Sequence, residues 1–175
     1  MTLADTPRFV HFSVEPFHGP VRPVSINRQE LHSKPRGFWI SDESGEDGWA
    51  DWCLGENFAT EALSHAASIE LADDAKLLWL KSDADIDHFS RQYGIPEHRF
   101  QRTYRVNWRP IAEEFQGIII TPYIWSRRLD DNCSWYYSWD CASGCIWDPA
   151  AIAGIAQTDA AAILDAIAQR NGGKG

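Results

Sequence analysis

Three segments of the chain combine polar and aromatic side chains in patterns that can do chemistry. The first, FVHFS at residues 9–13, places His11 in the middle of an otherwise apolar stretch. An imidazole in that position can be a hydrogen-bonded core residue, or it can orient a ligand hydroxyl from a strand into a cleft. His11 is therefore a candidate for either role.

The second segment, KPRGFWIS at residues 34–41, brings cations and a glycine next to aromatic residues. Lys34 and Arg36 carry cationic donors suited to an anion such as pyrophosphate. Gly37 has no β-carbon, which allows a close approach to its backbone. The alternative is that both charges are simply solvated.

Tryptophans follow in the same region of a chain that holds nine of them. Trp39 and Trp49 offer faces on which a ring can stack, and Ser41 offers a hydroxyl beside them. Trp49, Trp52 and Cys53 fall at positions i, i+3 and i+4, which places them on one face of a short helix. Trp39, Trp49 and Trp52 are candidate ligand-binding residues, with burial in the core as the alternative.

The third segment, WYYSWDCASGCIW at residues 135–147, has Asp140 at its centre. Its aromatic surroundings can raise the pKa of this carboxyl and make it a base or an acceptor for a ribose hydroxyl, or Asp140 can simply cap a turn. If the segment is a strand, Cys141 and Cys145 lie roughly 13 Å apart, at about 3.3 Å per residue. They then cannot share a metal, and we predict no metal site.

Composition narrows the possible function classes. The chain has 175 residues, a formal net charge of −9 and an ordinary globular mixture of side chains. An acidic surface repels nucleic acid and anionic membranes, and no apolar run approaches the roughly 20 residues of a membrane span. No secretory signal is visible at the N-terminus, so we expect a cytoplasmic protein with reduced cysteines.

The elements that must position these residues are short and alternate in type. We expect an α+β fold: a single domain over residues 1–170 with a mixed or mostly antiparallel twisted sheet, short helices, and a disordered tail at 171–175. Expected strands cover residues 8–14, 38–41, 117–123 and 134–147, with a hairpin formed by 68–71 and 76–81. Expected helices cover residues 48–58, 83–93, 107–115 and 158–170.

Taken in order, these segments resemble the layout of the ADP-ribosyltransferase fold. In that fold a first strand carries an Arg or His that contacts NAD, and a second strand carries a Ser or Tyr beside the nicotinamide. A late strand or loop carries an acidic residue that contacts the ribose. His11, Ser41 and Asp140 match these three positions. The stretches 34–53, 117–119 and 139–143 are also similar to small uncharacterised bacterial and phage proteins.

The resemblance implies NAD as substrate and either ADP-ribosyl transfer or NAD hydrolysis, of a toxin or effector type. Aromatic faces would sandwich the nicotinamide, His11 and Ser41 would hold the ribose and the amide, and Asp140 would stabilise the positive charge that develops as the glycosidic bond breaks. The acidic chain favours a protein or small-molecule acceptor over nucleic acid.

The chain lacks the Glu-x-Glu triplet that arginine-specific members of this fold use. Glu113 and Glu114 are reserve candidates for the acidic role, although they fall in an expected helix. One alternative is a non-catalytic, tryptophan-rich module that binds a nucleotide, a sugar or a protein. Another is an interaction protein whose acids, clustered at residues 42–51 and 83–87, mimic nucleic acid.

Overall fold

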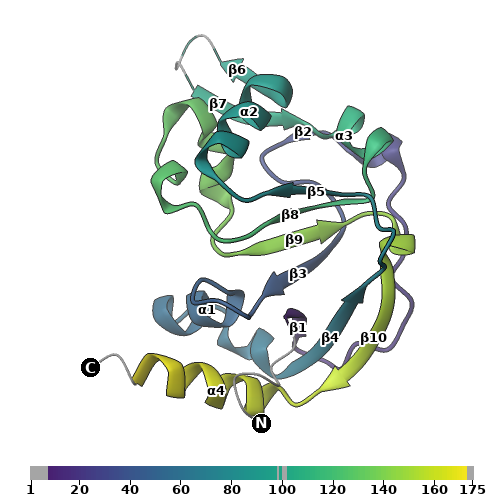
Figure 1. Ribbon diagram of the computed structural model, residues 1–175, viewed down its shortest axis with the longest axis vertical. Coiled ribbons are helices and arrows are strands. Elements are labelled where there is room, and N and C mark those ends of the chain that lie inside the picture. The colour runs from purple at the N-terminus through teal and green to yellow at the C-terminus, as the bar shows by residue number, and fades with distance from the viewer. Residues whose placement is uncertain (1–7, 98, 100–101, 173–175) are drawn as a thin grey trace.

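The computed structural model describes residues 8–97, 99 and 102–172. Its framework is a seven-stranded mixed sheet with strand order β10-β4-β1-β3-β9-β8-β5, in which β5 and β8 pair parallel and the other neighbours pair antiparallel (Figure 1). The strands are β1 (Phe9–Ser13), β3 (Phe38–Asp42), β4 (His65–Leu71), β5 (Leu77–Leu80), β8 (Gly117–Ile120), β9 (Ser143–Ile146) and β10 (Ile152–Thr158). The expected α+β class with a mixed sheet is confirmed.

A second, three-stranded sheet and the helices lie around this framework. The small sheet has the order β2-β7-β6, with β2 (Leu31–His32), β6 (Gly94–Glu97) and β7 (Arg102–Asn107). The α-helices are α1 (Trp49–Glu56), α2 (Asp83–Tyr93), α3 (Trp108–Glu114) and α4 (Ala160–Gly172). Single-turn or short 3-10 helices are η2 (Ile26–Arg28), η3 (Thr60–Leu63), η4 (Trp125–Arg127), η5 (Asp131–Ser138) and η6 (Pro149–Ala151).

The large sheet is held together least extensively between β1 and β3. These strands pair only at Phe9 with Asp42 and Val10 with Ser41, whereas β1 pairs with β4 over five positions. In Figure 1 the strands converge at the right and spread apart toward the left, where α1 lies below β3. The separation of β1 from β3 is the feature that creates the site described below.

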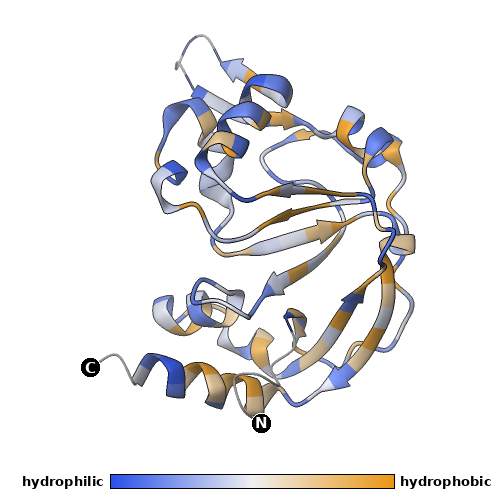
Figure 2. Ribbon diagram, in the orientation of Figure 1, coloured by the Kyte–Doolittle hydropathy of each residue, from blue (hydrophilic) through white to orange (hydrophobic). Residues whose placement is uncertain are grey.

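Buried clusters form on both sides of this separation. The largest packs β8 and β9 against α2, α3 and η5, and it contains the fully buried indoles of Trp108, Trp135 and Trp139. Another packs α1 and α4 over Val10 of β1. Figure 2 shows hydrophobic colour along β4, β8 and β10, while α2 and the end of α4 are largely hydrophilic. Several of the nine tryptophans therefore build the core.

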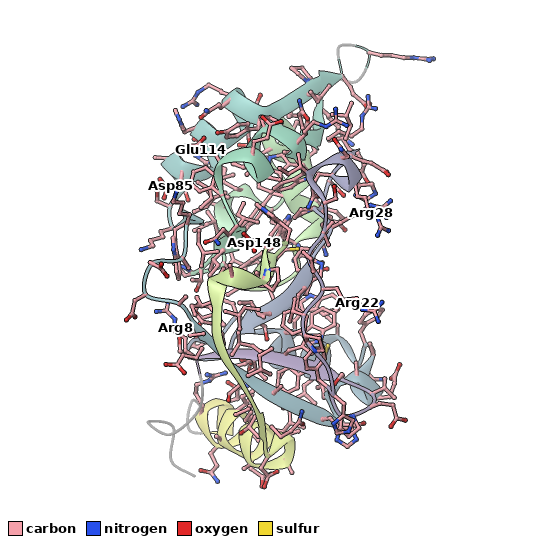
Figure 3. The ribbon with its side chains drawn as sticks, turned by 90° about the vertical axis from the view of Figure 1, so that its right-hand side faces the viewer. Arg8, Arg22, Arg28, Asp85, Glu114 and Asp148 are labelled. Carbon is pink, nitrogen blue, oxygen red and sulfur yellow. The ribbon has the colours of Figure 1, made fainter. Side chains whose placement is uncertain are left out.

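Most charged side chains lie at the outside of the molecule, whereas Asp42 and Glu43 are buried. In the view of Figure 3, Arg22 and Arg28 lie along one border, and Arg8 and Asp85 lie along the other. This is the distribution expected from the desolvation cost of ionised groups.

Most expected elements with a clear local signal are present. The strands predicted at 8–14 and 38–41 are β1 and β3, and the apolar run after residue 117 begins with the buried strand β8. Helix α2 covers the expected range 83–93, and its first turn is capped because the Ser82 hydroxyl accepts from the Asp85 N–H. These signals are local, so they depend little on the rest of the chain.

The predicted hairpin of residues 68–71 and 76–81 is wrong. Both segments are strands, but β4 pairs with β1 and β10, and β5 lies at the opposite edge of the sheet beside β8. A polar turn between two strands predicts that they pair only if neither has a better partner. Here both edges of β4 are taken by strands that are distant in sequence.

The predicted strand at 134–147 is wrong in its first half. Residues 131–138 form η5, and only 143–146 are the strand β9. Polar side chains stabilise the helical turns locally: Asp130 accepts from the Asn132 N–H, and the hydroxyls of Ser134 and Ser138 donate to carbonyls three residues earlier. Such local bonds compete with a sheet ladder.

The last helix also differs from the expectation at both ends. Thr158, the first residue of the expected helix, ends β10, and Asp159 accepts a hydrogen bond from the Ala162 N–H. Helix α4 includes Asn171 and Gly172, which we expected in a disordered tail. The remainder of that expected tail, residues 173–175, lies outside the described residues.

Candidate functional site

A pocket of about 370 Å³ opens where β1 and β3 separate. Three consecutive residues of each strand contribute to its wall, and α1, η3 and the segment before β9 complete it. The sequence-predicted residues that line it are His11, Lys34, Trp39, Ser41, Trp49 and Asp140. Tertiary structure therefore brings together residues that are as far apart in sequence as His11 and Asp140.

His11 spans the separation between the two strands. Its Nδ1 lies 2.8 Å from the backbone oxygen of Trp39, and because a carbonyl only accepts, Nδ1 is the protonated nitrogen. The ring stacks on Phe38 with centroids 4.3 Å apart. Burial lowers the pKa of His11, and the hydrogen bond to the Trp39 oxygen opposes this shift with a smaller effect. The ring is therefore neutral at neutral pH, and its Nε2 is a hydrogen-bond acceptor. His11 thus has a structural role as well as a place in the pocket wall.

Asp140 lies between two cations at the more exposed part of the pocket. Its carboxylate oxygens are 3.9 Å from Lys34 Nζ and 3.8 Å from an Arg128 guanidinium nitrogen, and 27% of its side chain is exposed. Burial raises the pKa of Asp140, and the two cations oppose that shift. Lys34 also lies 5.2 Å from the centre of the Trp39 ring. The loose pairing leaves Lys34, which lines the pocket, able to contact an anionic ligand group.

Ser41 occupies the closed part of the pocket, and Glu43 lies behind it. The Ser41 hydroxyl donates to Glu43 Oε1 at 2.5 Å, and the Ala50 N–H, at 3.4 Å, donates to the same oxygen. Glu43 is 1% exposed, and its Oε2 has no hydrogen-bond partner among the described residues. Burial raises the pKa of Glu43, and the bond from Ser41 opposes the shift.

Sequence reasoning missed Glu43, because residues 41–47 are polar and acidic, a composition typical of a solvated loop. Its burial results from α1, whose first turn folds back against the end of β3. The available signal was an acid two residues after a strand-end serine and just before a helix N-terminus, where backbone N–H groups attract carboxylates.

The tryptophans of the pocket are supported from behind. Trp49 stacks on Trp52 with centroids 5.2 Å apart and an angle of 18° between the rings. Trp39 meets the buried Trp139 edge to face at 5.0 Å. Trp52 therefore orients Trp49. The expectation that Trp52 itself contacts a ligand is not supported, because Trp52 does not line the pocket.

Two other candidates also lie away from the pocket wall. Arg36 pairs with Glu30 at 3.1 Å on the surface. A β-carbon on Gly37 would lie 2.6 Å from both Cys145 Sγ and the Ile146 oxygen. The close approach that this glycine allows is made by β9, and the expectation of a ligand there is not supported by its position.

Other groups that could suggest chemistry have structural partners. Asp83 and Asp87 pair with Arg127, and Arg102 pairs with Asp131. Within the described part of the chain, no group of three or more His, Cys, Asp or Glu side chains is arranged to hold a metal ion. Burial raises the pKa of Cys141 to about 12, which keeps this thiol protonated near the pocket.

Comparisons of this chain with protein-family models, with curated proteins and with solved structures find no match. In the ranges that the structure describes, none of the helices has the length and apolar character needed to cross a membrane. The chemistry of the pocket is therefore the basis for the function proposed next.

Proposed function

We propose that the pocket binds NAD and that the protein is an ADP-ribosyltransferase-like enzyme. It would transfer ADP-ribose to a protein or small-molecule acceptor, or to water. The observation that carries the proposal is the convergence of His11, Ser41 and Asp140 on one pocket. These are the residues that the resemblance selected, and they come from three separate parts of the chain.

The size and lining of the pocket suit part of a dinucleotide. Its volume of about 370 Å³ is near the lower end of the roughly 300–1,000 Å³ range of small-molecule sites. Trp39 and Trp49 provide aromatic surface for the nicotinamide ring. Lys34, which lines the pocket beside Asp140, provides positive charge for the pyrophosphate at the exposed side.

The proposed reaction breaks the bond between ribose C1′ and the nicotinamide nitrogen. The bonding electron pair leaves with nicotinamide, which becomes neutral, and positive charge develops on the ribose. The Asp140 carboxylate would stabilise that charge. The acceptor then bonds to C1′ and loses a proton; when water is the acceptor, the products are ADP-ribose, nicotinamide and a proton.

The test combines calorimetric titration of NAD with an assay of nicotinamide release. We expect binding and release by the wild-type protein, and a loss of release of at least about a hundredfold in Asp140→Ala. The control is Asp73→Ala, because Asp73 is an exposed turn residue that does not line the pocket. Absence of binding at millimolar NAD would refute the proposal.

A non-catalytic binding module is the alternative, and exposed aromatic residues favour it. Trp125 is 57% exposed and Tyr137 is 53% exposed, and Arg128 lies over both rings. Exposed Trp, Tyr and Arg side chains are typical of sites that bind a protein, a nucleotide or a sugar. NAD binding without nicotinamide release, equal in wild type and Asp140→Ala, would support this alternative.

A further inference from the structure

We propose that Glu43 fixes Ser41 as a hydrogen-bond acceptor toward the pocket, so that the pocket selects a carboxamide head group over a carboxylate. The inference rests on the proposed function in taking NAD as the natural ligand. Beyond the proposed function, the inference assigns the direction of the hydrogen bond between Ser41 and Glu43. It also assigns the resulting preference of the pocket for a carboxamide over a carboxylate. Glu43 is thereby a positioning residue, because it acts through Ser41 and does not line the pocket.

The direction of the bond between Ser41 and Glu43 follows from the other donor. The Ala50 N–H can only donate, and it points to the same Glu43 Oε1 that the Ser41 hydroxyl contacts. That oxygen is therefore an acceptor, and the single hydroxyl proton of Ser41 is directed at it. The other acceptor within reach, the Val10 oxygen, is 3.4 Å away and competes poorly with a contact of 2.5 Å.

With its proton directed at Glu43, Ser41 presents only lone pairs to a ligand. A carboxamide can donate its N–H to such an oxygen, but an ionised carboxylate has no donor. Repulsion acts in the same direction, since the acidic Glu43 lies directly behind Ser41. A carboxylate head group would therefore lose a hydrogen bond and meet like charge.

The difference in burial along the pocket sets the orientation of the ligand. Ser41 is 4% exposed, whereas the side chains of Lys34 and Asp140 are 35% and 27% exposed. An uncharged head group would occupy the closed part, and phosphates would lie near Lys34. The Ser41 hydroxyl, which requires a hydrogen-bond donor on the ligand, would thus contact the nicotinamide end.

Stability alone does not explain a buried acid at this position. No described cation forms an ion pair with Glu43, and its Oε2 lacks a partner in the described part of the chain. A buried carboxyl without an opposite charge is costly. A role in holding Ser41 gives a reason for the residue.

The experiment compares binding of NAD with binding of nicotinic acid adenine dinucleotide, which differs only in a carboxylate for the carboxamide. We expect the wild-type protein to prefer NAD by about tenfold or more, because an unmet acceptor in a buried site is strongly discriminating. Ser41→Ala and Glu43→Met should reduce the preference severalfold. Glu43→Gln keeps an acceptor oxygen at the position of Oε1 and should retain most of it.

Glu56→Gln is the matched control, since Glu56 is an exposed acid at the other end of α1. Thermal unfolding of each variant shows whether it has folded. Equal wild-type affinity for the two dinucleotides would overturn the inference while leaving the proposed function intact. The inference would also be overturned if Glu43→Gln preferred NAD as weakly as Glu43→Met does. The charge of Glu43, and not the direction of the hydrogen bond, would then be what distinguishes the two dinucleotides.

If neither dinucleotide binds, the proposed function fails, and the inference is tested with nicotinamide and nicotinate alone. Tryptophan indole N–H resonances in NMR spectra of the wild-type protein and of Trp49→Phe report binding at the pocket. A response of the Trp49 signal to nicotinamide and a much weaker one to nicotinate would support the acceptor role of Ser41. Equal responses, or none, would overturn it.

Discussion

At the scale of single residues, Glu43 combines a position directly behind the pocket residue Ser41 with an energetic cost. Its carboxyl is buried, and burial raises the pKa of Glu43 above the value that the unfolded chain has. A raised folded-state pKa means that the folded protein binds the proton more tightly than the unfolded chain does. Stability linked to Glu43 is therefore present below the unfolded pKa near 4.5 and is lost as the pH rises through the folded pKa.

Glu43→Gln should accordingly stabilise the protein at neutral pH. We expect a gain on the order of 1 kcal/mol at pH 7.5 that shrinks as the pH falls toward 4.5, because an amide carries no charge to bury. Thermal unfolding of wild type and variant across that pH range measures it, with Glu56→Gln as the exposed control. A variant that is less stable at every pH would contradict the explanation.

At the scale of elements, the pairing of β3 with β9 positions the pocket. Trp39 and Ser41 of β3 face Cys145 and Ser143 of β9 in the ladder, and Gly37 precedes the first paired residue. The close contact of Gly37 with Cys145 and Ile146 sets how closely the start of β3 approaches its neighbour. A change at Gly37 should therefore affect two pocket residues that it does not itself touch.

Gly37→Ala should destabilise the fold by about 1–3 kcal/mol, because its β-carbon would overlap a backbone oxygen that cannot move freely. Gly55→Ala is the matched comparison: Gly55 lies within α1, and nothing lies within 4 Å of the β-carbon it would gain. That variant should instead gain about 0.5–1 kcal/mol of stability. Urea unfolding measures both, and equal effects would contradict the packing argument.

At the scale of the whole molecule, the pocket lies across the weakest junction of the large sheet. One wall belongs to β1, which packs with α1 and α4, and the other belongs to β3, which packs with β9. Between them, β1 and β3 share two paired positions and the bond from His11 to the Trp39 oxygen. A ligand that contacts both walls should hold these parts together.

Bound NAD should therefore slow amide hydrogen exchange in β1 and β3 and raise the unfolding temperature. Ligand at a hundred times its Kd would add about 2.7 kcal/mol. Exchange in β6 and β7 of the small sheet should change less, because local opening there does not involve the pocket. Hydrogen-exchange mass spectrometry gives the comparison, and protection confined to the small sheet would contradict this placement of the ligand.

Much of the local structure and part of the site followed from the sequence. The β1 and β3 strands, the capped helix α2 and the buried strand β8 were predicted from short patterns. Six of the nine candidate site residues line the pocket. Such patterns are informative because caps, alternation and apolar runs involve neighbours in the chain, and these interactions are present before distant segments meet.

Tertiary structure decided what depends on distant partners. Whether β5 pairs with β4 or with β8 depends on which strand edges remain available, and no local pattern contains that information. From the sequence alone, Glu43 is expected to be a solvated acid and Gly37 a ligand contact. In the folded structure α1 covers Glu43, and β9 packs against Gly37. Burial and strand pairing are properties of surfaces that meet after folding, so the sequence alone determined the chemical groups and the fold determined which of them act together.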